Sequence, residues 1–291
     1  MGRYNTMRVN QRIAVFSTGL LLLIFPLFMR GSLPPPRADQ PQTESNFFDI
    51  LRPDEFSLLK QSRKFRSIPN KAFTVGEKFT FDIDWGFSTV GSASLAIPRI
   101  IKYNGFNVYE VRSRAQSNNL ISKIYKVDDQ VISYIDSTGI FSVRIEKKLS
   151  EGNYRQNREF ILDHIKQLAY SKRDTVKIPE YCQDILSAFY YVRTQNLKIG
   201  TVLEVPNYDN GKIYNIIVEV QKKQQVRVPA GKFNCIVIEP KLKSEGLFKH
   251  QGTIKIYLTD DERKIPVLMV SNVVFGEISA RLVKIEKEIY P

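Results

Sequence analysis

Two aspartates, Asp82 and Asp84, stand two positions apart in a segment where polar and apolar residues alternate. In an extended strand this spacing places both carboxylates on one side, about 6.5 to 7 Å apart at the backbone. Paired carboxylates at such a distance can serve a glycosidase. They can equally lie on a polar face opposite Lys or Arg of a neighbouring strand. We favour this second interpretation because no further acid in an enforced environment accompanies them.

Two other groups contain residue types that metal binding or catalysis uses. The run Asp260-Asp261-Glu262 could hold calcium, but a turn between strands is commonly acidic and the ligand spacing of a calcium loop is missing. Ser187 could act as a nucleophile only beside a base, and no histidine is near it in the sequence. We therefore predict neither a catalytic set nor a calcium site.

The chain has two cysteines, Cys182 and Cys235, and two histidines, His164 and His250. Zinc binding is disfavoured because no two of the four have the close spacing of a zinc site, so we predict no metal and no cofactor. In an oxidising compartment the two thiols could form a disulfide, which would stabilise the fold by about 4 kcal/mol. A buried free thiol at Cys235 is equally compatible with its apolar neighbours. The sequence leaves both states open.

Arg193 lies near the end of an amphipathic helix that the spacing of apolar residues predicts over residues 184–196. Its guanidinium could bind the carboxylate or phosphate of a ligand. It could also pair with Asp184 or with the carbonyl groups at the end of the helix. We favour the structural role.

A period-two pattern of apolar residues begins at about residue 75. Phe79, Phe81 and Trp85 alternate with polar residues, so one side of this strand is aromatic and the other is polar. The turn sequences Asn104-Gly105 and Asn210-Gly211 can join such strands as hairpins. Further strands are predicted at residues 107–115, 131–135, 141–145, 202–205, 214–220, 226–228, 233–238, 254–258, 267–274 and 278–285.

These elements predict a mainly β fold, either a large curved antiparallel sheet or a half-open β-barrel, with one or two helices. The concave side of such a sheet is apolar and must be filled by a helix, by side chains or by a ligand. We place the β-rich domain at residues 73–291. It follows a Pro-rich linker at residues 31–72, in which residues 53–65 could form a short helix.

The N-terminus carries an export signal. Arg3, Arg8 and Arg12 precede an apolar run at residues 13–29. The run is short for a helix that spans a membrane. The residues after it also form a poor cleavage site, because a signal peptidase requires small residues before the cut. Residues 1–30 are therefore a signal peptide or a signal anchor. Both predict a location in the periplasm or cell envelope, and the second adds attachment to the inner membrane.

The net charge of +13 is spread along the chain. No segment resembles a basic recognition helix or an aromatic platform for bases, so nucleic acid is not a predicted partner. In an envelope, the acidic partners available to such a surface are phospholipid head groups or lipopolysaccharide phosphates.

Several separated motifs resemble the domain of unknown function 3108 family. They are VGEKF at residues 75–79, FDIDW at 81–85, VGSA at 90–93, DILSAFYYVR at 184–193, VPAGKF at 228–233 and IKIYLTDD at 254–261. The resemblance implies an exported, mostly β bacterial protein from a family without an established activity. It also implies a fold akin to the half-open barrels of the outer-membrane lipoprotein carriers.

We therefore expect a noncatalytic envelope protein whose curved sheet binds or carries an apolar ligand, such as a lipid or the acyl chain of a lipoprotein. A structural or interaction protein of the envelope is the alternative, and an enzyme acting on envelope material is a third hypothesis. Under the first hypothesis the cavity is lined by Phe79, Phe81, Trp85, Phe189, Tyr190 and Arg193.

Overall fold

The computed structural model describes residues 65–172, 174–243, 253–273 and 276–287. The apolar run at residues 13–29, the linker up to residue 64 and all but the last residue of the helix expected at 53–65 lie outside the described residues. The strands are β1 (Glu77–Trp85), β2 (Ser88–Tyr103), β3 (Phe106–Ser117), β4 (Asp128–Asp136), β5 (Ser142–Glu151), β6 (Tyr154–Asp163), β7 (Leu168–Ser171), β8 (Thr175–Lys177), β9 (Val202–Asp209), β10 (Lys212–Val228), β11 (Gly231–Lys243), β12 (Ile254–Thr259), β13 (Pro266–Val273) and β14 (Gly276–Lys287); the helices are α3 (Asn119–Ser122) and α4 (Ile185–Thr194).

The fourteen described strands form one sheet in the order β8-β7-β6-β5-β4-β3-β2-β1-β14-β13-β12-β11-β10-β9. All neighbouring pairs are antiparallel. Strands β1 and β14 are the one neighbouring pair that is not consecutive in the chain. The sheet is thus built hairpin after hairpin, with β8 and β9 as its edges, and the predicted fold class is confirmed.

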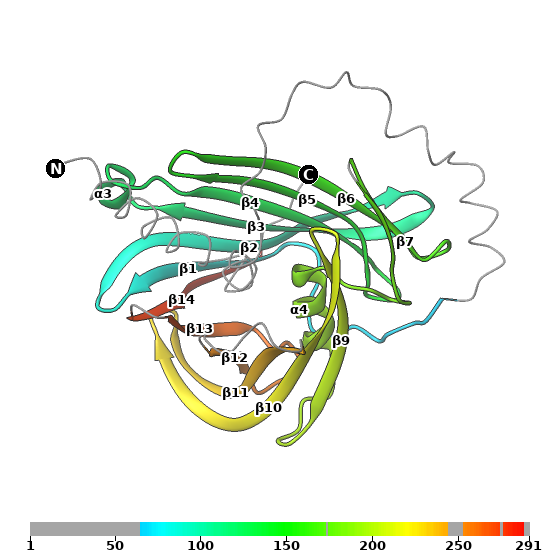
Figure 1. Ribbon diagram of the computed structural model, residues 1–291. Helices are drawn as coiled ribbons and strands as arrows, with labels where there is room; N and C mark the ends of the chain where they lie inside the picture. Colours follow the sequence, from blue (N-terminus) through cyan, green and yellow to red (C-terminus); the bar gives the residue numbers. More distant parts are fainter. Residues whose placement is uncertain (1–64, 173, 244–252, 274–275, 288–291) are drawn as a thin grey trace.

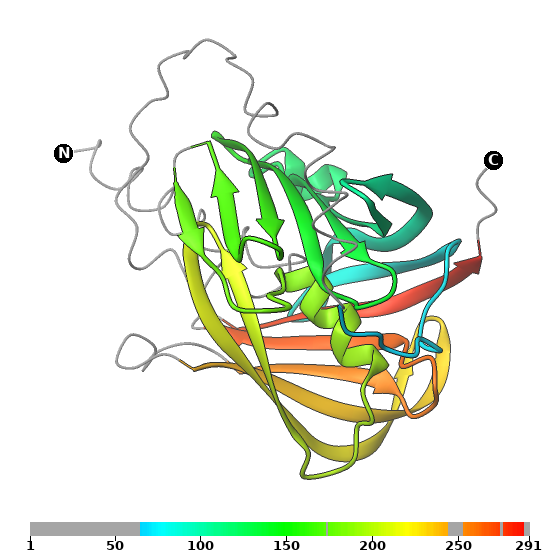
Figure 2. The ribbon, with the colours of Figure 1, turned by 90° about the vertical axis from the view of Figure 1, so that its right-hand side faces the viewer.

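The sheet curves so that its two halves face each other across α4. Figure 1 shows strands β4–β7 above and strands β9–β13 below, with α4 between them, and Figure 2 shows the helix crossing the interior. Leu186 and Tyr190 of this helix belong to the largest apolar cluster, whereas Ala188 and Val192 belong to a second cluster with β9–β12. The one long described helix therefore fills part of the concave side.

Contacts near the edge strand β9 tie the two halves together. Lys147 of β5 forms an ion pair with Asp209 of β9, and both side chains are largely buried. The rings of Phe160 and Tyr208, on β6 and β9, pack edge to face with their centroids 5.6 Å apart. These contacts bridge the two halves of the sheet where no strand pairing joins them.

The two predicted hairpin turns occur as the sequence indicates. Asn104 and Gly105 have φ angles of 43° and 72°, and Asn210 and Gly211 have φ angles of 48° and 83°. Two successive positive φ angles are typical of the tight turn whose twist matches that of the flanking strands. These turns set the register of β2 with β3 and of β9 with β10.

The chain ahead of β1 packs on the sheet from Phe65 onward. Phe65 contacts the rings of Phe106 and Phe141 at centroid distances of 5.6 Å each. Ala72 and Phe73 are buried in the main core. Neither described helix has the length and hydrophobicity needed to cross a membrane.

Candidate functional site

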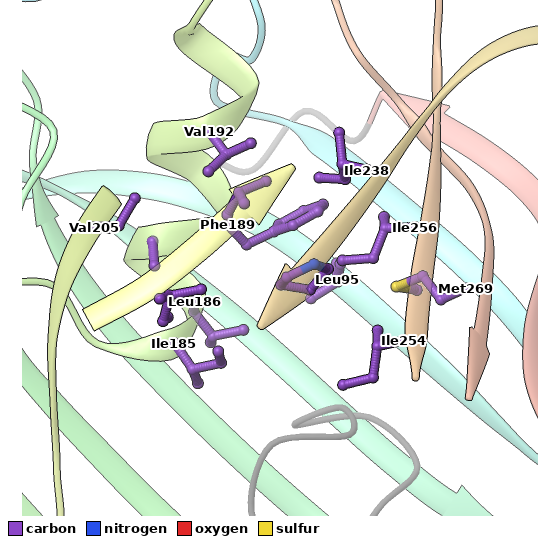
Figure 3. Close-up of a pocket in the computed structure, with 14 residues that line it drawn as sticks. Leu95, Ile185, Leu186, Phe189, Val192, Val205, Ile238, Ile254, Ile256 and Met269 are labelled. Carbon is purple, nitrogen blue, oxygen red and sulfur yellow. The ribbon is translucent and has the colours of Figure 1, made fainter. Parts of the chain in front are cut away.

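An apolar groove runs between α4 and the inner side of strands β9–β13. Fourteen residues line it, and none of them has a polar or charged side chain. Figure 3 shows Phe189 of the helix extending toward Ile238 and Ile256 on the facing strands. The lining residues are Leu95, Ile185, Leu186, Ala188, Phe189, Val192, Val205, Ile216, Val218, Ile238, Pro240, Ile254, Ile256 and Met269.

The groove is open at one side and is not filled by its own side chains. Its unfilled space is about 740 Å³ with the solvent at its mouth included, and the cavity within it is about 70 Å³. Most lining residues are buried, but Ile185, Phe189, Pro240 and Ile256 are only half-buried. These four residues mark the mouth. The deeper walls are purely aliphatic, so the interior attracts apolar groups and offers no partner to polar ones.

The N-terminal end of α4 is held by a side-chain cap. Asp184 accepts hydrogen bonds from the backbone N–H groups of Leu186 (2.8 Å) and Ser187 (3.1 Å), and Ser187 Oγ accepts one from the N–H of Asp184 (2.8 Å). This is the reciprocal arrangement that satisfies the free donors of a helix start. Ser133 of β4 also donates to Asp184 (2.6 Å). The cap therefore fixes the helix to the sheet as well as beginning it.

The C-terminal end of α4 is held by a buried ion pair. The guanidinium of Arg193 donates to both carboxylate oxygens of Glu77 on β1, at 2.8 and 3.0 Å, and neither side chain is more than 2% exposed. It also donates to the carbonyl groups of Ala72, Arg263 and Lys264, at 3.1 Å each. Burial acts to lower the pKa of Arg193, but the Glu77 carboxylate outweighs it, so the pKa is raised. Arg193 therefore stays charged, and the helix is held at both ends.

The space beside α4 is bounded by apolar side chains. No lining side chain can donate, accept or transfer a proton. Among the described residues, no three His, Cys, Asp or Glu side chains are placed to hold a metal ion. The arrangement is suited to removing an apolar chain from water by the hydrophobic effect.

The model of the family described as "Protein of unknown function (DUF3108)" matches residues 80–283. The chain belongs to this family. No curated protein sequence shows a significant match to it. In fold, this DUF3108 protein is similar to the crystal structure of a β-barrel-like protein of domain of unknown function DUF1849 from Brucella abortus. The TM-score is 0.51 and the identity 12%, over 77% of this chain and 99% of that chain.

A second solved structure, a protein with a YmcC-like fold from Bacteroides fragilis NCTC 9343, is 15% identical over 77% of this chain and 100% of that chain. Its TM-score of 0.34 is too low for an argument from shape. The fold likeness of this DUF3108 protein therefore rests on the Brucella structure.

Of the six residues expected to line a cavity in this DUF3108 protein, Phe189 lines the groove. Phe79, Phe81 and Tyr190 are fully buried in the core cluster beside it. Arg193 is engaged by Glu77 and three carbonyl groups and is not directed at a ligand. These contacts are of the structural kind favoured for Arg193, with Glu77 rather than Asp184 as its partner.

Trp85 is the clearest difference from the expected placement. The alternation of Phe79, Phe81 and Ile83 put its side chain inside, yet it is 43% exposed. The register shift between β1 and β2 at this point leaves Val90 of β2 unpaired, whereas β1 keeps an unbroken register with β14 from Phe81 to Trp85. Trp85 therefore stays on the side of Ile83, opposite Ile278, and its exposure reflects its place as the last residue of β1.

The other candidate residues have structural partners. Asp84 pairs with Arg281 and accepts a hydrogen bond from Thr89 (2.7 Å), which agrees with the interpretation of Asp82 and Asp84 as polar-face acids. Asp261 accepts hydrogen bonds from Thr259 (2.7 Å) and from the backbone N–H groups of its own turn. Ser187 belongs to the helix cap. Asp84, Asp261 and Ser187 thus make contacts within the fold.

The two cysteines are buried free thiols, so the disulfide that the sequence left open is not formed in the structure. Burial raises the pKa of Cys182 to about 12 and that of Cys235 to about 11. Both thiols are therefore protonated at neutral pH and are poor nucleophiles.

The sequence did not predict most of the groove, because nearly all of its residues have ordinary aliphatic side chains. A signal was present in the alternation of Ile216 with Val218, and of Ile254 with Ile256, which marks the inward face of β10 and β12. The same pattern marks every core strand. The groove differs from the core in the unfilled space between α4 and the facing strands, and this space depends on where α4 lies.

Proposed function

We propose that this protein is a noncatalytic protein of the cell envelope that binds one apolar chain, from a lipid or a lipoprotein, in the groove along α4. The observation that carries the proposal is a partly open space whose fourteen lining side chains are all apolar. Sites for small ligands are commonly apolar clefts of roughly 300 to 1,000 Å³ with a few polar groups. A groove whose side chains carry no polar group suits the apolar part of a ligand.

The dimensions favour a slender chain over a compact ligand. The cavity within the groove is about 70 Å³, well below the roughly 300 to 1,000 Å³ of a typical small-ligand site, so a narrow chain end fits better than a compact ligand. An alkyl chain can enter end first and leave its polar head at the mouth, near Phe189 and Ile256. Each methylene group that it buries contributes about 0.8 kcal/mol.

The location in the envelope is supported by the N-terminal sequence. Arg3, Arg8 and Arg12 followed by the apolar residues 13–29 are typical of a segment that directs export. A retained segment would anchor the protein in the inner membrane, where acyl chains are available. A cleaved one would release it to the periplasm, where a chain needs a carrier. The groove has a use in both cases.

The noncatalytic part of the proposal is supported by the structural contacts that the candidate reactive side chains already make. Arg193, Asp84 and Ser187 serve a clamp, a strand pair and a helix cap. An enzyme acting on envelope material would need a group near the mouth that is free to react.

The proposal is tested by photo-crosslinking in cells that make the full chain and are fed a fatty acid bearing a terminal diazirine. Peptide mapping is expected to find the adduct on α4 and on β12, around Phe189 and Ile256. The substitution Ile256→Trp should fill the mouth and remove most of the adduct. Val202→Trp, at a position that is 60% exposed outside the groove, is the matched control and should leave it unchanged.

Adducts found elsewhere in the chain, or adducts unaffected by Ile256→Trp, would overturn the proposal. The alternative, an interaction protein of the envelope, would then gain weight. The observation that favours it is a group of exposed apolar residues at one end of the sheet, which includes Phe87 and Leu120.

A further inference from the structure

One end of the sheet exposes four large apolar side chains. Phe87, in the turn between β1 and β2, is fully exposed, and Trp85 beside it is 43% exposed. Leu120 of α3 is 69% exposed, and Ile124, just after α3, is 74% exposed. Single exposed apolar residues are common on protein surfaces, but a group of them marks an interaction site. We refer to these four residues as the apolar tip.

The two segments that form the apolar tip are joined by hydrogen bonds. Asn118, the residue before α3, donates from its side chain to the carbonyl of Thr89 (2.8 Å) and from its backbone N–H to that of Val90 (2.9 Å). The same side chain accepts from the N–H of Ile121 (2.9 Å) and so begins the helix. Figure 1 shows α3 and the β1–β2 turn at the same end of the molecule. A short helix is thus held beside a hairpin turn, and both carry exposed apolar residues.

The surroundings of the apolar tip are basic. Lys123 and Lys126 are exposed, and residues 85–90 and 118–127 contain no acid. Arg155 is also exposed, and two hydrogen bonds place it near Lys126. Its guanidinium donates to the carbonyl of Gly152 (2.7 Å), and the N–H of Gly152 donates to the carbonyl of Lys126 (2.8 Å).

Of the described acids that flank these segments, Asp84 pairs with Arg281 and Asp128 with Arg114. Glu277 of β14 is exposed beside the β1–β2 turn, where its carbonyl accepts a hydrogen bond from the N–H of Gly86 (3.0 Å), so basic side chains outnumber this one acid. The tip therefore presents apolar groups with a positive border.

We propose that the apolar tip docks on the surface of an anionic lipid bilayer. Trp and Phe side chains favour the interface between head groups and acyl chains, and neighbouring lysines favour anionic head groups. The tip projects outward, as the full exposure of Phe87 shows, and none of its four residues lines a described hollow. A projecting apolar tip with a basic border complements a fluid anionic surface. The inference is independent of what the groove binds.

The experiment uses the fact that Trp85 is the one tryptophan of the chain. The full chain is reconstituted in vesicles of phosphatidylcholine, with or without phosphatidylglycerol, and the fluorescence of Trp85 is recorded. In anionic vesicles we expect its emission to shift to shorter wavelength and to be quenched by lipids brominated on their acyl chains. Because the signal comes from Trp85 itself, attachment through residues 1–30 does not imitate it. Added salt should reduce the shift, since the lysines act through charge.

Three variants make the test specific. Phe87→Ser/Leu120→Ser/Ile124→Ser should abolish the quenching and return the emission to its wavelength in neutral vesicles. Lys123→Gln/Lys126→Gln should weaken docking on anionic vesicles by roughly tenfold or more. Ile199→Ser/Val202→Ser, which removes exposed apolar residues just before β9 and at its first position, should change nothing.

An emission that stays at its value in neutral vesicles, with no quenching by brominated lipids while the chain is attached to anionic vesicles, would overturn the proposal. So would quenching that the triple serine variant keeps. Either result would make the tip a surface for a protein partner. All substituted side chains are exposed, so circular dichroism should show the fold unchanged in each variant.

Discussion

The two sides of helix α4 differ in how completely they are filled. Tyr190 and Arg193 lie on one side, with no exposed surface, and pack against Phe73 and Glu77. The other side carries Ile185, Ala188, Phe189 and Val192, which line the open groove. The filled side fixes the position of the helix, and the unfilled side becomes available to a ligand because the helix cannot move to close the gap.

A large effect is expected on breaking the ion pair of the filled side. Arg193→Met leaves the buried Glu77 carboxylate with the half-exposed Arg263, 3.6 Å away, in place of its close buried partner, which should lower the free energy of unfolding by about 3 kcal/mol. The double variant Glu77→Leu/Arg193→Met buries no charge and should recover much of this loss. Urea unfolding of the three proteins measures both values. Equal losses in the single and double variants would mean that the pair is not what holds the helix.

Two neighbouring aromatic residues allow a direct comparison of the two sides. Tyr190→Ala removes a ring that packs edge to face on Phe73, with centroids 4.8 Å apart, and should lower the free energy of unfolding by about 3 to 5 kcal/mol. Phe189→Ala removes a half-buried ring that already borders unfilled space, so its loss should be smaller by about 2 kcal/mol. Urea unfolding midpoints again give the answer. Losses of equal size would indicate that the groove is as well packed as the core.

Asp129 is a third buried site that sharpens the comparison. Its charged form is disfavoured, whereas the charged form of Arg193 is favoured. Burial, and then the neighbouring Glu151, raise the pKa of Asp129 to about 7. In the unfolded chain this carboxyl group loses its proton near pH 4. The folded state alone keeps the proton between these values, so the contribution of Asp129 to the free energy of unfolding should be greatest below about pH 4 and fall as the pH rises to about 7.

Asp129→Asn should remove this loss. At pH 8 the variant should be more stable than the unchanged protein by roughly 2 kcal/mol, and at pH 4 the two should be nearly equal. Thermal unfolding at the two pH values measures the difference. A variant that is less stable than the unchanged protein at pH 8 would show that the charged form of Asp129 stabilises the folded protein.

The sequence predicted those parts of the fold that depend on neighbouring residues. Period-two alternation gave the strands, Asn104-Gly105 and Asn210-Gly211 gave two hairpins, and Asp184 gave the start of the helix. Each of these signals lies within a few positions of the feature that it predicts. The mainly β antiparallel architecture followed from them.

The candidate site could be predicted only in part, because its features depend on residues far apart in the chain. Arg193 and Glu77 are 116 positions apart, so the partner of Arg193 had no local signal. Trp85 continues the alternation of β1 but is the last residue of the strand, and the alternation alone does not show that its side chain is exposed there. Phe79 and Phe81 were correctly expected on the inner side, but the inner side is divided into a filled core and an unfilled groove.

The central claim is that the groove along α4 holds an apolar chain, and native mass spectrometry of the gently purified full chain tests it most directly. We expect a population that carries one lipid or acyl chain, identified after extraction, and expect this population to be lost in Ile256→Trp and kept in Val202→Trp. A protein that carries no lipid, or that carries the same lipid in Ile256→Trp, would contradict the account.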